Sequence, residues 1–344
     1  MSSGLTFAFV MDPIQSIDIR GDTTFVLMLE SQRRGHRLLY LEQTDLGVDA
    51  ARGPVARVRP VTMRREIGRH ADLGEPERVA LDEVADVVFQ RKDPPVDADY
   101  ITATQILSLC RRALVLNRPE GILAANEKLY ALHFADLMPP TRVTRSIAEL
   151  RAFLDELGGE MIVKPLDGRG GEGIFHVSAR DRNLISILEQ STRFGTRAVM
   201  GQQYLSAVRA GDKRILLVDG EPIGAVLRVP PEHEHRANLH VGGRAAKTSL
   251  DEGDRAIVDR IAPSLRRDGL FFVGLDVIGG RLTEVNVTSP TGVQEIDAIE
   301  GRSLEADVID AVERRVQAWR AGRKEPAGTS RREADTRRPT RSEA

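Results

Sequence analysis

Residues 271–288 read Phe-Phe-Val-Gly-Leu-Asp-Val-Ile-Gly-Gly-Arg-Leu-Thr-Glu-Val-Asn-Val-Thr, and this stretch predicts a buried β-hairpin. Two apolar runs, Phe271–Ile278 and Arg281–Val287, flank a pair of glycines, and glycine favours the tight turns that join antiparallel strands. Side chains alternate between the two faces of a strand. The polar residues Glu284 and Asn286 are therefore expected on one face, together with Leu282 and Thr288, and the valines on the other.

Two carboxylates on neighbouring strands predict a site for a hard cation. Asp276 shares a face with Glu284 only if the numbers of paired residues add to an even value, which a two-residue turn would prevent. We predict a three-residue loop, Ile278-Gly279-Gly280, which pairs Val277 with Arg281 and brings the carboxylates together. With the amide oxygen of Asn286 they suit magnesium, which takes one or two carboxylates plus substrate phosphates. The alternative is a charged face in contact with water.

A glycine-rich loop precedes the hairpin by about one hundred residues. Residues 167–173 read Asp-Gly-Arg-Gly-Gly-Glu-Gly, and backbone N–H groups in such a loop can approach an anion closely. The loop lies between two expected strands and not before a helix, so it differs from a dinucleotide-binding fingerprint and suits a loop that covers phosphates. Lys164, three residues before the loop, adds positive charge. A flexible hairpin tip is the alternative interpretation.

The N-terminal part of the chain alternates strands with helices, which predicts a parallel sheet with crossover helices. The expected strands are Thr6–Met11, Arg37–Glu42, Ala85–Gln90 and Leu114–Asn117, and the expected helices are Thr23–Arg34 and Tyr100–Arg112. Residues 118–126 are expected to form a boundary, because Pro119 and Gly121 interrupt regular structure.

Strands dominate the middle of the chain, which predicts antiparallel α+β structure there. The expected strands are Thr141–Thr144, Met161–Pro165, Ile174–Val177, Ala198–Gln203, Lys213–Val218 and Ile223–Val229. The expected helices are Asn126–Phe134, a helix capped by Ser146, Asp251–Asp268 and Ser303–Arg320.

A basic set of residues surrounds a long polar loop. Arg214 lies on an expected strand, while Arg228, Arg236 and Arg244 accompany residues 230–243. A loop of this length with little apolar content is typical of a lid over a site. Its three histidines, at positions 233, 235 and 240, lack the spacing of metal ligands, so a lid is the favoured interpretation.

Composition excludes several other classes. The net charge of −2 argues against a general nucleic-acid binder, and a single cysteine, Cys110, excludes an intramolecular disulfide framework and indicates a reducing compartment. No apolar run has the 18 residues of a membrane span, and residues 5–11 are too short for a signal peptide. The basic end after residue 321 carries no large aliphatic residue and is expected to be disordered.

Nine segments together resemble prokaryotic glutathione synthetase, an ATP-grasp ligase, from about residue 7 to residue 319. They are Met11–Ile14, Gln32–Gly35, Arg91–Pro95, Asn126–Leu129, Lys164–Gly168, Gly211–Arg214, Val218–Pro222, Phe272–Asp276 and Leu282–Thr291. The resemblance implies an N-terminal parallel α/β (pre-ATP-grasp) domain followed by an ATP-grasp fold with antiparallel sheets. It also implies ATP-dependent joining of γ-glutamylcysteine to glycine.

The resemblance assigns roles to particular residues. The expected ATP ligands are Lys128, Lys164, Gly168, Gly170, Gly171, Gln202, Gln203, Tyr204, Leu205 and Asp212, of which residues 202–205 form the adenine hinge. Magnesium, or manganese, would bind Asp276, Glu284 and Asn286, in agreement with the hairpin pattern. The expected substrate ligands are Arg91, Arg214, Arg228, Arg236, Arg244, Ser289 and Thr291. Arg214, Arg228 and Lys164 would act on the reacting groups, and Arg214 is expected to stabilise the oxyanion.

The expected organisation is an α/β substrate-side domain at 1–121, an ATP-grasp domain at 122–321 with a lid subdomain at about 126–205, and a disordered basic tail at 322–344. The resemblance implies a homotetramer with small-molecule substrates. The single cysteine predicts the cytoplasm, and the composition predicts no nucleic-acid or membrane partner. Two alternatives stay open: another ATP-grasp carboxylate–amine ligase with a different acceptor, and a non-catalytic nucleotide-binding module. Compared with relatives, the lid has few glycines, and Gly292 replaces a larger residue.

Overall fold

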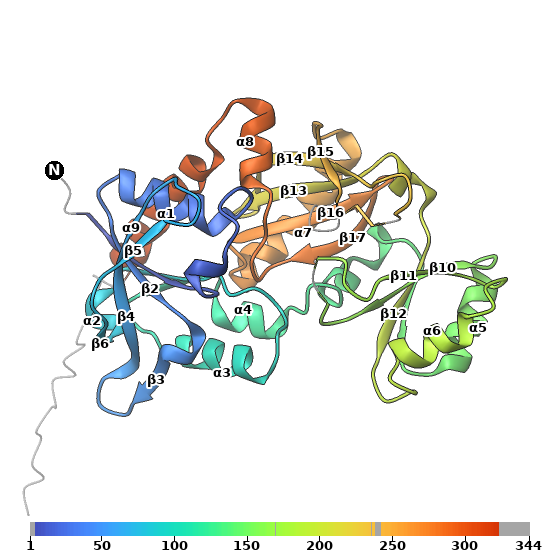
Figure 1. The fold of residues 1–344 in the computed structure, drawn as a ribbon, viewed down its shortest axis with the longest axis horizontal. Helices are drawn as coiled ribbons and strands as arrows, with labels where there is room; N and C mark the ends of the chain where they lie inside the picture. The colour runs from blue at the N-terminus through green and yellow to red at the C-terminus, as the bar shows by residue number, and fades with distance from the viewer. Residues whose placement is uncertain (1–3, 169, 235, 238–241, 323–344) are drawn as a thin grey trace, which may run out of the picture.

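Three β-sheets organise the chain into three lobes (Figure 1). The computed structural model describes residues 4–168, 170–234, 236–237 and 242–322. The disordered tail was expected at 322–344, but Gly322 is the last residue of a helix, and residues 323–344 lie outside the described residues. Arg169, His235 and His240 of the two expected loops also lie outside them.

The N-terminal lobe is built on a mixed sheet in the order β3-β4-β2-β1-β7-β8, with β5 and β6 paired to β4. Strands β2, β1, β7 and β8 run parallel to one another, which confirms the expected parallel α/β unit. Its strands are β1 (Thr6–Val10), β2 (Arg37–Leu41), β3 (Leu46–Asp49), β4 (Gly53–Met63), β5 (Ala71–Leu73), β6 (Glu77–Ala80), β7 (Val87–Gln90) and β8 (Leu114–Leu116).

Helices cover this sheet, and the two long ones begin at side-chain caps. The carboxylate of Asp22 accepts a hydrogen bond from the backbone N–H of Phe25, and Asp97 caps the second long helix in the same way at Tyr100. The helices are α1 (Thr23–Arg33), α2 (Leu81–Val84), α3 (Ala98–Leu107) and α4 (Pro119–Ala124). The short 3-10 turns are η1 (Ile14–Ser16) and η2 (Gln43–Asp45).

The second lobe, at the right of Figure 1, is a small antiparallel sheet in the order β11-β10-β12-β9 with two helices packed on it. Its elements are β9 (Thr141–Thr144), α5 (Ile147–Glu156), β10 (Glu160–Pro165), β11 (Phe175–Ser178), α6 (Leu184–Ser191) and β12 (Val199–Gln203). Ser146 caps α5 as predicted, since its hydroxyl accepts from the N–H of Glu149. A small hydrophobic core centred on Leu150, Met161 and Leu188 holds this lobe together.

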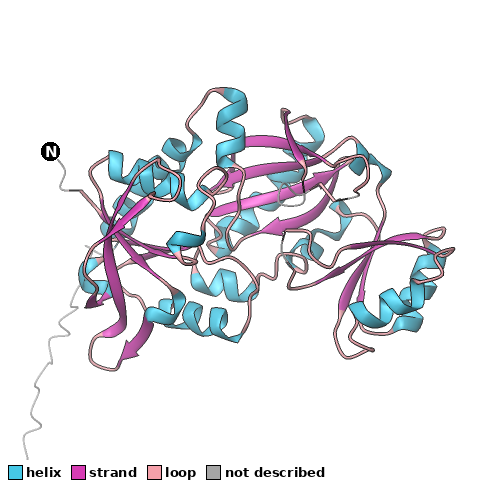
Figure 2. Cartoon of the chain, in the orientation of Figure 1, coloured by secondary structure: helices cyan, strands magenta, loops and turns pink. Residues whose placement is uncertain are grey.

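The third lobe contains an antiparallel sheet in the order β15-β14-β13-β16-β17. Its elements are η3 (Tyr130–Leu137), η4 (Ser206–Arg209), β13 (Asp212–Val218), β14 (Glu221–Val229), β15 (Arg244–Lys247), α7 (Glu252–Asp268), β16 (Phe272–Ile278), β17 (Arg281–Asn286), α8 (Val293–Glu300) and α9 (Leu304–Gly322). Helices flank this antiparallel sheet (Figure 2), so the predicted fold class, α/β followed by antiparallel α+β, is confirmed.

The first and third lobes share buried structure. Helix α9 packs against α1, and residues of both lobes enter one hydrophobic cluster. The side-chain amide of Asn117, after β8, donates to the carbonyls of Phe272 and Val287 and accepts from the N–H of Phe272. The end of the N-terminal sheet is therefore joined to the hairpin that carries the carboxylates.

Several expectations about local structure were wrong. Pro119 and Gly121 do not interrupt regular structure, since residues 119–124 form α4 with Pro119 in the first helical turn, where its missing N–H has no cost. Gly121 is required by packing: a Cβ there would lie 2.2 Å from the carbonyl oxygen of Asp268. The helix expected at 126–134 is instead the 3-10 segment η3, with non-helical dihedral angles at Phe134.

Candidate active site

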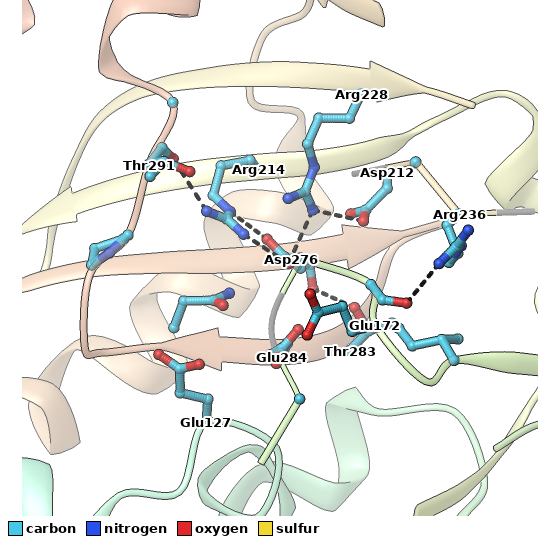
Figure 3. A pocket seen from close by; sticks show the side chains of 18 of the residues that line it. Glu127, Glu172, Asp212, Arg214, Arg228, Arg236, Asp276, Thr283, Glu284 and Thr291 are labelled. Carbon is cyan, nitrogen blue, oxygen red and sulfur yellow. Dashed lines mark hydrogen bonds and ion pairs between the residues drawn. The ribbon is translucent and has the colours of Figure 1, made fainter. Parts of the chain in front are cut away.

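A cavity of about 780 Å³ lies where the three lobes meet. Residues of all three sheets or of the loops that follow them line it, and the side chains from β13, β14, β16 and β17 point into it (Figure 3). Most of the residues predicted for the site come together here. They are Lys128, Lys164, Gly168, Gly170, Gly171, Gln202, Gln203, Tyr204, Leu205, Asp212, Arg214, Arg228, Arg236, Asp276, Glu284, Asn286, Ser289 and Thr291.

Asp276 and Glu284 are directly paired across β16 and β17, as the cation-site prediction requires. The predicted three-residue loop is wrong, however: Ile278 pairs with Arg281, so the turn contains only Gly279 and Gly280. A β-bulge next to Asp276 shifts the register by one residue, and this shift restores the shared face.

Thr283 is the extra residue of the bulge. Its hydroxyl donates to the backbone carbonyl of Asp276 at 3.1 Å, and its own carbonyl accepts from Nζ of Lys164 at 3.2 Å. The bulge also turns Leu282 into the hydrophobic core with Val285, which corrects the expectation that Leu282 would share the face of Glu284.

Two arginines hold the Asp276 carboxylate. Arg214 lies opposite Asp276 on β13 and donates through Nε and Nη2, the latter to Oδ2 at 3.0 Å. Nη2 of Arg228, on β14, lies 3.0 Å from the same Oδ2. Burial alone would raise the pKa of Asp276, but the two guanidinium groups outweigh it and hold the pKa well below its usual range. Asp276 is therefore an anion in the interior.

Asp212 completes this charged group. Its Oδ2 accepts from Nη2 of Arg228 at 2.6 Å, whereas its buried Oδ1 has no hydrogen-bond partner among the residues that the structure describes. Burial raises the pKa of Asp212 to about 6 despite the neighbouring Arg228. Asp212 lines the cavity, and a buried carboxylate oxygen without a partner is suited to accept a further hydrogen bond.

Two buried lysines lie beside the carboxylate pair. Nζ of Lys128 is 2.9 Å from Oε1 of Glu284 and 2.9 Å from the carbonyl oxygen of Gly168. Burial opposes the charge of Lys128, but Glu284 outweighs it and raises the pKa. Burial lowers the pKa of Lys164. Burial alone would raise the pKa of Glu284, but the charges of Lys128 and Lys164 outweigh it and lower that pKa. Buried cations and buried carboxylates therefore lie next to one another in this part of the cavity lining.

The oxygen donors fit a hard cation. The side-chain N–H of Asn286 donates to the carbonyl of Gly274 at 3.2 Å, which leaves its amide oxygen for another partner. Together with the carboxylates of Asp276 and Glu284 this gives three oxygen-bearing side chains at one edge of the cavity. In the described part of the chain no group of three His, Cys, Asp or Glu side chains could hold a metal ion.

The glycine loop lies between β10 and β11, as predicted, and its described residues line the cavity. The guanidinium of Arg236, from the expected lid, donates to the carbonyl of Gly171 at 3.1 Å and pairs with Glu234. Arg209 donates to the carbonyls of Glu232 and Glu234. The described lid residues therefore touch the glycine loop across the cavity.

The expected hinge follows β12. The amide of Gln202 donates to the hydroxyl of Thr141 at 2.9 Å, and the ring of Tyr204 stacks on His176 with centroids 3.9 Å apart. These contacts hold the segment 202–205 as one wall of the cavity between the second and third lobes. A flat heterocycle fits beside such a wall.

Two predicted substrate residues lie outside the cavity lining. Arg91 is buried beneath it, donating to the hydroxyl of Thr24 at 3.1 Å and the carbonyl of Pro290 at 2.9 Å, with Phe272 below its guanidinium. Arg244 is exposed at the start of β15. Arg91 thus supports the 289–291 segment from behind, and the structure does not bring Arg244 to the other residues.

The sequence patterns missed Glu127. Its Oε1 accepts from the N–H groups of Val287 and Thr288 and from the Thr288 hydroxyl, and burial raises its pKa. It lines the cavity beside Lys128 and holds the end of β17 in place. In the sequence, only the position of Glu127 next to Lys128 indicated that it belongs to the site. The acidic residues that the N-terminal lobe contributes were also missed, because they are far from the glycine loop in sequence.

Comparison with known proteins gives two matches to one family. The description "Prokaryotic glutathione synthetase, N-terminal domain" matches residues 5–122, and "Prokaryotic glutathione synthetase, ATP-grasp domain" matches residues 127–301. Glutathione synthetase from Mesorhizobium japonicum is 48% identical over 310 residues, which cover 90% of this chain and 98% of that protein. The Gloeobacter violaceus protein of the same name is 48% identical and covers 88% and 94%. The Salmonella typhimurium one is 44% identical and covers 91% and 99%.

Solved structures of lower identity share the fold. D-cycloserine synthetase DcsG superimposes with a TM-score of 0.65 at 16% identity, covering 90% of this chain and 99% of that one. A RimK domain ATP-grasp protein from Sphaerobacter thermophilus gives a TM-score of 0.59 at 17% identity, covering 89% and 98%. Across the described residues, no helix has the length and apolar character needed to cross a membrane.

Proposed function

This chain belongs to the prokaryotic glutathione synthetase family and is an ATP-dependent ligase that synthesises glutathione, and we propose the following roles for its residues. The observation that supports them best is the pairing of Asp276 with Glu284 in a cavity that also holds Lys128, Lys164 and Arg214. Carboxylates for a metal and cations for phosphates meet there, as phosphoryl transfer requires.

ATP would lie between the second and third lobes. Its adenine would contact the hinge Gln202–Leu205, and the unpartnered Oδ1 of Asp212 would accept from a hydroxyl of its ribose. Lys128, Lys164 and the backbone of Gly168, Gly170 and Gly171 would contact the phosphates. The burial of the two lysines supports this phosphate site, because a bound phosphate would compensate the ammonium groups for the water they lose on burial.

Magnesium, or manganese in its place, would be held by Asp276, Glu284 and Asn286, whose oxygens fit a hard cation. When bound, the metal would neutralise charge on the transferring phosphoryl group. The chain's own residues would do the rest: Lys164 neutralises phosphoryl oxygens, and Arg214 and Arg228 hold Asp276 in position. The same arginines would bind the reacting carboxylate.

The reaction would proceed through an acyl phosphate. A carboxylate oxygen of γ-glutamylcysteine attacks the γ-phosphorus, the bond to ADP breaks, and a mixed anhydride forms. The neutral amine of glycine then attacks the acyl carbon, the C–O bond to phosphate breaks, and the nitrogen loses a proton. Arg214 would stabilise the tetrahedral oxyanion, an effect worth about 10²–10³ in rate for one preorganised donor.

Ser289, Thr291 and Arg236 are proposed to surround the two substrates, and the lid around Arg236 would exclude water from the anhydride. Arg91 would contribute by holding the carbonyl of Pro290 and thereby the 289–291 segment. Gly292 has a φ of 125°, which disfavours any side chain at this point of the cavity wall.

We further propose the domain limits 1–121 and 122–321, with a lid subdomain at about 126–205. The homotetramer and the cytoplasmic location stay predictions, the latter supported by the single Cys110. A ligase for another acceptor is not favoured, because relatives at 43–48% identity are named glutathione synthetase.

Oxygen transfer tests the proposed chemistry. γ-Glutamylcysteine labelled with ¹⁸O in its cysteinyl carboxylate would be incubated with ATP, Mg²⁺ and glycine. The acyl-phosphate route predicts one ¹⁸O atom in each phosphate released, measured by mass spectrometry. Phosphate that carries only ¹⁶O would contradict it.

A further inference from the structure

Residues 14–22 form a wall of the cavity in the N-terminal lobe. Ser16, Ile17, Asp18, Gly21 and Asp22 all line the cavity, although the segment has little regular structure beyond one 3-10 turn. Irregular segments of this kind are ordinarily mobile unless other parts of the molecule hold their backbone. Here both ends are held.

The first end is held at Ile14 by two buried side chains. The N–H of Ile14 donates to the hydroxyl oxygen of Tyr40 at 3.2 Å, and Nε2 of His70 lies 2.6 Å from the Ile14 carbonyl, to which it donates. Tyr40 lies on β2, and His70 directly precedes β5. The ring of His70 also packs edge-on against the ring of Phe25. Both backbone groups of Ile14 are therefore satisfied from outside the segment.

The second end is held by Gln294, in the first turn of α8. Its side-chain N–H group donates to the carbonyl of Ile19 at 3.1 Å and to that of Asp22 at 2.7 Å. Helix α8 begins directly after Thr291 and Gly292, which line the same cavity. One amide of the third lobe thus connects the N-terminal wall to the segment on the opposite side.

The charge of this wall indicates which substrate it faces. Asp12, Asp18, Asp22 and Asp93 line the cavity from the N-terminal lobe, whereas the lysines and arginines line it from the other two lobes. Asp12 pairs with Lys92 and Asp18 with Arg20, so this wall offers carboxylates and their partners to a ligand with both ammonium and carboxylate groups, whereas the cations suited to phosphates line the other lobes. The wall is therefore placed for the amino-acid substrate and not for the nucleotide.

We propose that Tyr40, His70 and Gln294 are positioning residues that hold residues 14–22 against γ-glutamylcysteine and so set the affinity for that substrate and not for ATP. This inference rests on the proposed function. It concerns residues that do not line the cavity themselves and act through the backbone of the segment they hold.

Gln294→Ala tests the proposal, with Gln105→Ala on the exposed face of α3 as the matched control. Loss of two hydrogen bonds to the segment is expected to raise the KM for γ-glutamylcysteine about tenfold. The KM for ATP and the Kd of a non-hydrolysable ATP analogue, measured by calorimetry, should stay within about twofold of the parent. An equal rise in the KM for ATP, or no change in either KM, would overturn the proposal.

Hydrogen exchange provides a readout that is independent of turnover. Tyr40→Phe removes the acceptor of the Ile14 N–H, so exchange in a peptide that contains Ile14 should accelerate while the melting temperature stays close to that of the parent. His70→Gln, which can donate in place of Nε2, should restore the KM that His70→Ala raises. An unchanged exchange rate in this peptide of Tyr40→Phe would contradict a role for Tyr40 in holding Ile14. A parent without glutathione synthesis would refute the proposed function, whereas a parent with turnover and unaffected variants would refute only this inference.

Discussion

Asp276 and Glu284 face each other across β16 and β17 only because a β-bulge compensates for a two-residue turn. The turn alone would place the two carboxylates on opposite faces of the sheet. The bulge residue, Thr283, also supplies the carbonyl that Lys164 contacts. One irregularity in one strand therefore positions a carboxylate pair and a buried lysine.

Asp276→Asn should lower both stability and activity. The substitution keeps the shape of the side chain but removes the charge that Arg214 and Arg228 share in the interior, and breaking such a pair costs about 3–5 kcal/mol. We expect the free energy of unfolding in urea to fall by about 3 kcal/mol and kcat to fall at least about a hundredfold. Asp259→Asn, on the exposed side of α7, should change neither quantity. An Asp276→Asn variant with parental stability would show that the two ion pairs contribute nothing.

Glu284→Gln should raise the requirement for magnesium. A glutamine retains one oxygen donor but loses the charge that attracts the cation and that pairs with Lys128. At fixed ATP, the concentration of free Mg²⁺ that gives half-maximal activity should increase about tenfold or more. Binding of Mn²⁺ with an ATP analogue, followed by electron paramagnetic resonance, should weaken in parallel. If the Mg²⁺ dependence stays as in the exposed control Glu252→Gln, Glu284 is not a metal ligand.

Much of the fold follows from local patterns in the sequence, because those patterns report on local physics. Alternating and apolar runs predicted β9 at its observed limits and β1, β2, β10 and β12 to within a residue. Side-chain caps such as Asp22 and Ser146 mark where helices begin.

The segments that were missed lack such patterns. Residues 46–80 carry three short strands, β3, β5 and β6, together with the longer β4, whose arginines and prolines interrupt any apolar alternation. Helix α8 begins at Gly292 without a side-chain cap.

The composition of the site was easier to predict than its geometry. The residue types at Lys164, Asp276 and Glu284 indicate phosphate and metal chemistry wherever they lie. The bulge at Thr283 depends on packing of Leu282 in the core, which no pairwise rule along the strand reveals. Contacts such as Gln294 with Ile19 join positions 275 residues apart, so only the tertiary structure shows them.

Arg236→Ala should uncouple ATP hydrolysis from ligation. Arg236 connects the described lid residues to the glycine loop through the carbonyl of Gly171, and its loss should admit water to the acyl phosphate. The ratio of phosphate released to glutathione formed should rise from one to about two or more. Arg33→Ala, at an exposed position on α1, serves as the control. A ratio of one in the variant would exclude a water-excluding role for Arg236.

Asp297→Asn should change how stability depends on pH. Burial and a hydrogen bond with Glu305 raise the pKa of Asp297 from 3.8 to about 7 in the folded protein. The folded state then holds the proton more tightly than the unfolded state, so this group's stabilising effect is fully present below about pH 4 and declines as the pH rises to about 7.

Asparagine has no charge to bury and can still accept from the N–H of Leu304. The variant should therefore gain in melting temperature relative to the parent at pH 8 and gain less at pH 5. Asp307→Asn, at the surface next to Arg302, provides the comparison. A difference between variant and parent that is independent of pH would contradict a raised pKa at Asp297.

The most direct test of the central claim is the substrate requirement for phosphate release. The purified protein with ATP and Mg²⁺ would be assayed with γ-glutamylcysteine and glycine together and with each omitted, and the product would be identified by mass. We predict stoichiometric phosphate and glutathione only when both substrates are present, and little phosphate when either is absent. Turnover with a different carboxylate and amine but none with this pair would contradict the assignment, and ATP binding without turnover under every pairing would contradict catalysis itself.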